Sequence, residues 1–248
     1  MNIALIGYGV MGKLIEKHAL ERGHRLIFTV DPVAPDAHFQ SISDIDCSNI
    51  DCAIEFTRPE AAVENIRNLA SKGIPTVVGT TGWYSRLDEV QNIVEKAGSS
   101  LVYAANFSLG VNLFYRIAAF AANLMDPFPM YDVGGFEAHH NRKKDSPSGT
   151  AIALMEHILA AMKRKDTVLW DRLERPTLPN EIHMASLRAG AIPGTHSLCF
   201  DSSADTILIQ HTARNREGFA SGALAAAEWL TAQHRKGLFT IDDVLDNQ

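Results

Sequence analysis

Short apolar runs alternate with amphipathic stretches along the first hundred residues. The apolar runs have the length of buried strands, and we expect strands at Asn2–Ile6, Arg25–Val30, Cys52–Phe56, Thr76–Val78 and Leu101–Ala104. Helical spacing in the stretches between them predicts helices at Lys13–Arg22, Pro59–Ser71 and Ser85–Ala97. Gly23, Gly73 and Gly98 follow these helices, where a left-handed residue is favoured. Strands that alternate with helices predict right-handed βαβ units and a parallel sheet.

The pattern changes after Phe107. Helices are expected at Val111–Met125 and from about Ser148, and strands at Asp132–His139, His183–Arg188, Thr195–Phe200 and Thr206–His211. The turn-rich segment 201–204 joins the last two strands, which indicates an antiparallel hairpin. A final Ala-rich helix, Phe219–His234, is expected to return to the first domain. We therefore predict one domain from residues 1–106 and 217–248, and a second, α+β domain with a mainly antiparallel sheet from residues 107–216.

Composition and charge narrow the class of protein. The chain has 248 residues, 46% hydrophobic and 21% charged, which is typical of a globular protein. A net charge of -6 argues against a general nucleic-acid partner, although a few local cations can still bind a small anion. The three cysteines are too few for a disulfide framework. No apolar run is long enough for a signal sequence or a membrane span, so we expect a cytoplasmic protein with no membrane partner.

A glycine-rich motif follows the first predicted strand and precedes the first helix. Gly7, Gly9 and Gly12 form the pattern G-x-G-x-x-G, which provides a tight turn, close backbone approach to a pyrophosphate and close helix packing. Asp31 ends the second strand, 19 residues after Gly12, where a carboxylate can bind ribose hydroxyls. The alternative is a glycine-rich turn with a helix-capping aspartate. We favour a Rossmann-type, doubly wound α/β domain that binds a dinucleotide.

Residues 137–151 gather the most reactive side chains of the chain. Two histidines and two lysines follow a predicted strand, and a helix then begins at Ser146-Pro147 or at Ser148. The free N–H groups near Gly149 and Thr150 would suit a carboxylate. A charged surface loop is the alternative. His139 and His140 are adjacent and diverge on either a strand or a helix, so we predict no metal site.

The same segment resembles a known family. Its pattern E-A-H-H-x-x-K-x-D-x-P-S-G-T-A is similar to the signature of dihydrodipicolinate reductases. The resemblance continues through the glycine motif and through residues 78–82, 104–108, 188–190, 194–196 and 219–223. Two positions depart from the family pattern: Glu55 stands where Asp is usual, which leaves its role open, and Ser146 stands where Ala is usual.

The resemblance implies specific roles. His139 would donate a proton and Lys143 would complete the catalytic pair. His140, Lys143, Gly149 and Thr150 would bind the two carboxylates of a small cyclic substrate. NADH or NADPH would contact Gly7, Tyr8, Gly9, Val10, Met11, Gly12, Asp31, Gly79, Thr80, Thr81, Ala104, Ala105, Asn106 and Phe107.

By the same resemblance the protein would be a homotetramer. It would reduce 4-hydroxy-tetrahydrodipicolinate, by way of dihydrodipicolinate, to tetrahydrodipicolinate in lysine and diaminopimelate synthesis. The alternatives are another two-domain dehydrogenase, or a protein that senses the dinucleotide without turnover. No separate basic helix-turn-helix segment is evident in the sequence, which disfavours the second alternative.

Asp31 also bears on the choice of cofactor. It should repel a 2′-phosphate, and residues 32–35 contain no Arg or Lys to bind one. We therefore expect NADH to be used at least as well as NADPH. Lys13, Arg58 or His38 could still assist a phosphate.

Overall fold

Residues 1–232 and 234–246 are described by a computed structural model, in which the chain forms two compact units. The first unit comprises Met1–Leu109 and the segment that starts at Arg216, and the second comprises Gly110–Asn215. Each unit has its own sheet and its own hydrophobic core. The second unit is therefore an insertion into the chain of the first.

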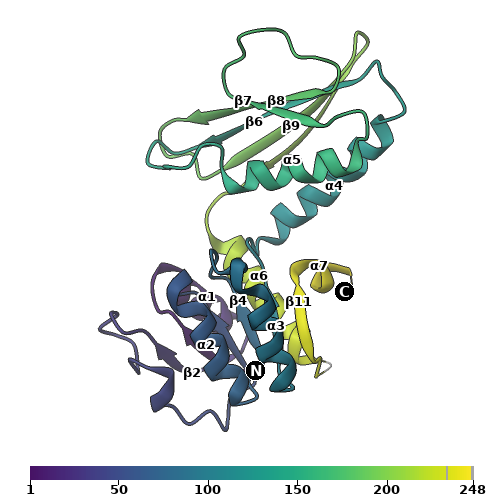
Figure 1. The fold of residues 1–248 in the computed structure, drawn as a ribbon. Helices are drawn as coiled ribbons and strands as arrows, with labels where there is room; N and C mark the ends of the chain where they lie inside the picture. The colour runs from purple at the N-terminus through teal and green to yellow at the C-terminus, as the bar shows by residue number, and fades with distance from the viewer. Residues whose placement is uncertain (233, 247–248) are drawn as a thin grey trace. The chain divides into compact units, whose positions relative to one another are not determined.

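The sheet of the first unit is entirely parallel. Within the described residues its strands lie in the order β11-β5-β4-β3-β1-β2, and Figure 1 labels β11, β4 and β2 among them. They are β1 (Asn2–Ile6), β2 (Arg25–Val30), β3 (Cys52–Glu55), β4 (Thr76–Val78), β5 (Ser100–Tyr103) and β11 (Gly237–Thr240). The helices are α1 (Val10–Glu21), α2 (Pro59–Ser71), α3 (Leu87–Lys96), α6 (Glu217–Ala232) and α7 (Ile241–Asp246), with 3-10 turns at Ile42–Asp44 and Tyr84–Arg86.

Helices cover both faces of this sheet, because successive side chains of a strand point to opposite sides. Ile3 and Leu5 of β1 belong to the core that α1 and α6 close. Ala4 and Ile6 belong to the opposite core, which includes Leu69 of α2. The arrangement is the doubly wound fold that the sequence pattern predicts.

Several predicted boundaries need small corrections. Helix α1 begins at Val10 instead of residue 13, because Gly12 already belongs to the helix. Helix α3 begins at Leu87 instead of residue 85, after the 3-10 turn. Strand β3 ends one residue early, β5 is shifted by one residue, and α6 begins at Glu217. Gln233, inside the predicted final helix, lies outside the described residues. The sequence pattern missed β11 and α7.

The second unit has a mixed sheet. Its strands are β6 (Asp132–His139), β7 (Thr167–Trp170), β8 (Glu181–Arg188), β9 (Thr195–Asp201) and β10 (Thr206–Thr212), in the order β10-β9-β6-β8-β7. Strand β9 runs antiparallel to β6 and β10, which confirms the predicted hairpin, whereas β8 runs parallel to β6 and β7. The predicted antiparallel character thus describes the β6-β9-β10 half. Strand β7 was not predicted.

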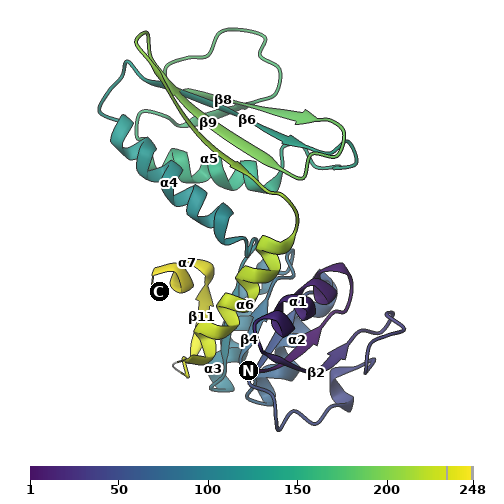
Figure 2. The same ribbon diagram turned by 180° about the vertical axis from the view of Figure 1, so that it is seen from behind.

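Two helices, α4 (Leu109–Met125) and α5 (Gly149–Ala161), lie against one face of this sheet, as both views show (Figures 1 and 2). Ala118 of α4 and Leu154 of α5 share a core with Met184 and Leu198 of the sheet. Phe136 and Leu187 alternate with these inward positions and are exposed. One face of the sheet is therefore packed and the other is bare within the unit. Among the described residues, no helix is both long enough and apolar enough to cross a membrane.

Candidate active site

The glycine motif forms a tight loop between β1 and α1. Gly7 has φ +93°, and its N–H donates to the carbonyl of Val30 at 2.8 Å. A Cβ at Gly7 would overlap the carbonyl oxygen of Phe56, and one at Gly12 would overlap the carbonyl oxygen of Gly7. These two glycines are required by the fold itself.

Gly9 differs from its two neighbours in the motif. It is the N-cap of α1 with no side-chain cap, and a Cβ placed on it would meet no atom within 4 Å. Val10 follows at the surface, with 68% of its area exposed. The free N–H groups at the start of α1 therefore face open space, which fits a pyrophosphate. Tyr8, Gly9, Val10 and Met11 occupy the positions expected of a dinucleotide loop.

Asp31 anchors this loop as well as facing it. Its carboxylate accepts hydrogen bonds from the backbone N–H groups of Tyr8 (2.8 Å), Val33 (2.8 Å) and Ala34 (3.0 Å). Burial acts to raise the pKa of Asp31, but these bonds and the Arg58 guanidinium hold it below its ordinary value. Asp31 is therefore a fixed negative charge, whose remaining lone pairs are left for a ribose.

The three side chains that could assist a 2′-phosphate are not equally available to bind one. Lys13 lies 5.3 Å from the centre of the Tyr8 ring and pairs with Asp36 at 2.6 Å. His38 accepts the backbone N–H of Thr29 through Nδ1 at 3.2 Å. Arg58 acts electrostatically on Asp31. Arg58 is thus the cation best placed to offset the repulsion between Asp31 and a 2′-phosphate.

The other two predicted cofactor segments follow neighbouring strands. Gly79 and Thr80 come after β4, and residues 104–107 come after β5, so both lie at the carboxyl edge of the sheet, as the glycine loop does. A Cβ at Gly79 would overlap the Phe56 ring. Thr80 Oγ1 accepts the N–H of Thr57 at 2.7 Å. The three segments thus meet at one edge, although they are far apart in sequence.

The residues of these two segments differ in exposure, so some can contact a cofactor and others support the backbone. Thr81 and Ala105 are exposed, whereas Ala104 and Phe107 are buried, and the Asn106 side chain accepts the N–H of Ser108 at 2.8 Å. Support also comes from α6, because a Cβ at Gly222 would overlap the carbonyl oxygen of Phe107. This helix approaches the end of the β5 loop only because residue 222 has no side chain.

Glu55, whose role the sequence left open, is fully buried at the end of β3. It accepts hydrogen bonds from the Thr57 hydroxyl and from Asn65 Nδ2, the latter at 3.2 Å. Burial raises its pKa, and its second oxygen has no hydrogen-bond partner among the described residues. Glu55 thus lies beneath the predicted cofactor surface and is tied to the loop that follows β3.

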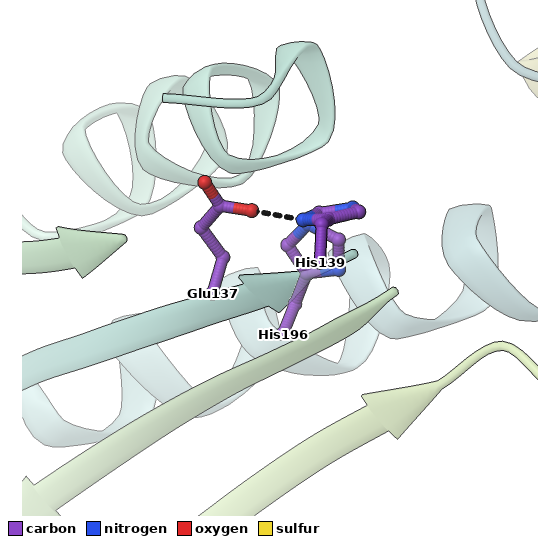
Figure 3. A group of neighbouring side chains, drawn as sticks. All are labelled: Glu137, His139 and His196. Carbon is purple, nitrogen blue, oxygen red and sulfur yellow. Dashed lines mark ion pairs between the residues drawn. The ribbon is translucent and has the colours of Figure 1, made fainter. Parts of the chain in front are cut away.

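In the second unit, strand register gathers a polar cluster on the covered face of the sheet. Glu137 and His139 are two positions apart on β6 and share that face. His196 of β9 pairs with Glu137, and Arg188 of β8 pairs with His139. Figure 3 shows the Glu137 carboxylate directed at His139, with the His196 ring alongside.

Glu137 is the centre of this cluster and is fully buried. One oxygen, Oε1, accepts a hydrogen bond from Arg188 Nη2 at 2.6 Å and from the Ser148 N–H at 3.2 Å. The other, Oε2, forms an ion pair with Nδ1 of His139. Burial acts to raise the pKa of Glu137, but Arg188, Ser186 and His139 keep it below its ordinary value. Glu137 is therefore held as an anion.

The two imidazoles of the cluster differ in environment. Burial lowers the pKa of His139, while Glu137 opposes this effect and Lys143 and Arg188 add to it. Burial and the neighbouring His139 lower the pKa of His196 further, to about 4. The two rings meet edge to face, 5.2 Å apart. His139 alone combines an anionic partner with a role as a predicted proton donor.

Helix α5 begins beside the cluster. Ser148 is its N-cap, because Oγ of Ser148 accepts the N–H of Ala151 at 3.1 Å and lies 3.2 Å from His196 Nε2. Pro147 therefore precedes the helix and does not lie in its first turn, which corrects one of the two starts we considered. Gly149 and Thr150 occupy the first two helical positions, where N–H groups lack intrahelical partners.

Lys143 and His140 lie in the loop between β6 and α5. Lys143 pairs with Asp145 at 2.8 Å and is close enough to His139 to affect its pKa. His140 falls just after β6 and is half-buried. The structure thus brings Lys143 near His139, and places Gly149 and Thr150 at a helix start that is anchored to Glu137.

A carboxylate and two imidazoles are also ligand types found in zinc sites, and the ligand atoms of Glu137, His139 and His196 lie within 4.8 Å of one another. However, the charge of Glu137 is already matched by Arg188, and its second oxygen is occupied by the contact with His139. Lys143 adds a further positive charge. A divalent cation would be repelled by Arg188 and Lys143, so the arrangement favours a hydrogen-bonded network.

Sequence reasoning assigned no role to Glu137, Arg188 or His196, and it considered Ser148 only as a possible helix start. The first signal was available, because Glu137 and His139 are two positions apart on a predicted strand and must share a face. Arg188 and His196 could not be placed, since their positions depend on the register of β8 and β9.

A parallel sheet with a glycine loop in one unit, and a histidine beside a helix start with free N–H groups in the other, define the class of nucleotide-dependent oxidoreductases. Comparison with known proteins is more specific. The family model for the N-terminus of dihydrodipicolinate reductase matches residues 1–107, and the model for the C-terminus matches residues 110–245. The chain belongs to the dihydrodipicolinate reductase family.

Relatives and solved structures agree with this assignment. A 4-hydroxy-tetrahydrodipicolinate reductase of Christiangramia forsetii is 41% identical over 247 residues, covering 100% of this chain and 98% of the relative. One from Staphylococcus aureus is 34% identical over 98% of this chain and 100% of the relative. A dipicolinate-bound dihydrodipicolinate reductase from a Paenisporosarcina species has a TM-score of 0.80, with 22% identity over 97% of each chain, and so shares the fold.

Proposed function

We propose that this protein reduces 4-hydroxy-tetrahydrodipicolinate, by way of dihydrodipicolinate, to tetrahydrodipicolinate with NADH or NADPH, in lysine and diaminopimelate biosynthesis. Full-length similarity to reductases of that name supports the proposal. The observation that carries it is the Glu137 carboxylate, which contacts the predicted proton donor His139 and the N-cap of the predicted carboxylate site. A proton donor held beside an anion site suits reduction of a small dicarboxylate.

The nicotinamide supplies the hydride in such a reaction, and the side chains of the second unit supply the rest. A hydride added to C4 of the unsaturated ring leaves enamine-like negative charge, and the imidazolium of His139 would neutralise it by protonation. Lys143, His140 and the first N–H groups of α5 would bind the two carboxylates. Lys143 would also stabilise charge that develops during the step.

Substrate binding itself would help to load the proton donor. Burial, Lys143 and Arg188 disfavour the charged form of His139 in the free protein. A dianionic ring next to His139 would add two negative charges and favour the imidazolium. The donor would then carry its proton mainly when a substrate is present.

The first unit would hold the cofactor. The loop from Gly7 to Gly12 would bind the pyrophosphate, Asp31 the ribose, and the segments after β4 and β5 the nicotinamide side. The second unit would bind substrate and form the subunit contacts of a homotetramer in the cytoplasm. Its bare sheet face, with Phe136 and Leu187 exposed, supports assembly through that unit.

One assay tests the proposal. Freshly prepared 4-hydroxy-tetrahydrodipicolinate should cause loss of reduced nicotinamide absorbance with NADH or NADPH. No turnover with either cofactor would overturn the proposal. Turnover with a different amino or keto acid instead would favour another two-domain dehydrogenase. Cofactor binding without any turnover would favour a sensor protein.

A further inference from the structure

A fully buried carboxylate is costly unless its partners match its charge, and Glu137 has partners from three different elements. Arg188 comes from β8, Ser148 from the start of α5, and His139 from β6 itself. The two donors Arg188 and Ser148 share Oε1, so Oε2 is left for the imidazole. The imidazole nitrogen that faces Oε2 is Nδ1 of His139.

With Nδ1 of His139 at Glu137, Nε2 is the nitrogen left for a reactant. A Cβ at Gly194 would lie 3.1 Å from this Nε2, so the absence of a side chain there keeps the space beside it open. An anionic carboxylate accepts an N–H, which places a proton on Nδ1 in both charge states of the ring. Nε2 would then lose its proton when it protonates carbon, leaving the neutral ring with its proton on Nδ1.

We propose that Glu137 is a positioning residue of this reaction. It holds Nε2 of His139 as the donating atom through one oxygen and fixes the N-cap of the carboxylate site through the other. The inference rests on the proposed function. It goes beyond that function because it assigns to one side chain the positioning of both the proton donor and the anion site.

Because of the other groups around His139, the charge of Glu137 is what favours the imidazolium form. Lys143 from the loop and Arg188 from β8 are cations that disfavour the imidazolium. His196 from β9 lies beside the ring, and His211 from β10 lies beyond His196. Ser148 from α5 is uncharged. Among these groups, Glu137 is the anion that contacts the imidazole.

Glu137→Gln tests the role with almost no change in shape. Because Oε1 receives two donors, the amide should keep its oxygen there and turn its NH₂ toward His139, which stabilises the neutral ring with its proton on Nε2. We expect kcat at pH 7.5 to fall by at least about tenfold and the alkaline limb of the kcat/KM profile to move down by about one pH unit or more. KM for NADH should stay within about twofold of wild type.

Glu181→Gln is the matched control. Glu181 is a buried glutamate of the same sheet, paired with Arg175 at 2.6 Å, and it is not part of the proposed machinery. This variant should lose stability but keep the wild-type pH profile. An unshifted profile in active Glu137→Gln would overturn the inference, whereas an inactive wild-type protein would overturn the proposed function. Loss of wild-type activity on treatment with EDTA would also overturn the inference, because it would show that the cluster holds a metal.

A second measurement covers the case in which Glu137→Gln does not fold. Nitrogen NMR of the histidines in wild-type protein, assigned by comparison with His139→Gln, reports where the neutral ring carries its proton. A proton on Nδ1 supports the role of Glu137. A proton on Nε2 overturns it, whatever the outcome of the turnover assay.

Discussion

The two units build their polar sites in opposite ways. The predicted cofactor loop of the first unit offers backbone N–H groups from one short stretch of sequence, and its key residues, Gly7 and Gly12, matter because they have no side chain. The cluster of the second unit uses side chains from strands β6, β8 and β9, which neighbouring backbones bring together. The first site should therefore be broken by adding atoms, and the second by removing charge.

The largest expected effect is in the backbone site. Gly7→Ala would place a Cβ in an overlap with Phe56 at φ +93°, so we expect a loss of at least about 3 kcal/mol in the free energy of unfolding. In Gly9→Ala the added Cβ would lie in open space, so the free energy of unfolding should stay within about 1 kcal/mol of wild type. The affinity for NADH should nevertheless fall by at least about tenfold. Denaturant unfolding and NADH titration separate the two. Equal stabilities of the two variants would contradict this view of the loop.

The side-chain site should respond to loss of its predicted proton donor. His139→Gln should lower kcat by about 10²- to 10⁴-fold, the usual contribution of general acid catalysis, with little change in NADH affinity. Steady-state kinetics, combined with a single-turnover measurement, gives the chemical step. More than half of wild-type kcat, where chemistry limits turnover, would remove His139 from this role.

The anion site should distinguish two carboxylates from one. Dipicolinate should compete with the substrate, and picolinate should bind more weakly because it forfeits a charge-assisted hydrogen bond worth about 1.5–3 kcal/mol. Lys143→Ala should reduce this difference. The measurement is the inhibition constant of each compound for wild type and variant, and equal inhibition by the two compounds would show that only one carboxylate is bound.

Acid should weaken the second unit through His196. Its pKa in the folded protein is about 4, below the ordinary 6.5, so the unfolded chain binds more protons as the pH falls below 6.5. The stabilisation by the neutral ring is fully present above about pH 6.5 and is lost as the pH falls toward 4. The loss in the free energy of unfolding reaches about 2 kcal/mol at pH 5. His196→Asn should flatten the stability profile between pH 7 and 5. Parallel profiles for the variant and wild type would refute this.

The smallest effect concerns cofactor choice. NADH should have at least the kcat/KM of NADPH, because Asp31 is held ionised and Lys13 is already paired with Asp36. Arg58→Ala should increase the preference for NADH, since it removes the cation that acts on Asp31. Kinetics with both cofactors, repeated at raised ionic strength, gives the ratio. An NADPH advantage of tenfold or more, about 1.4 kcal/mol, would show that Asp31 does not set the choice.

The same contrast explains what the sequence could predict. The parallel sheet, the glycine loop and Asp31 depend on local periodicity and on a contiguous motif, and they lie where expected. Strand β11 was missed because its four residues are too few to show a periodic pattern. It becomes a strand by pairing with β5, which is far away in the sequence. Arg188 and His196 were missed as partners of Glu137 because only strand register brings them together. A one-residue slip would send either of them to the other face.

The insertion of the second unit has a consequence for how the protein is made. Helix α6 contributes Ala223, Leu224 and Ala227 to the core of the first unit, and it is synthesised after all of residues 110–215. Multidomain chains generally fold in the order of synthesis. Here the ribosome must complete the continuous second unit before the first can close its core. A chain that ends at Asn215 and has been released from the ribosome should therefore contain a protease-resistant second unit preceded by 109 protease-sensitive residues, so the segment made first becomes stable last.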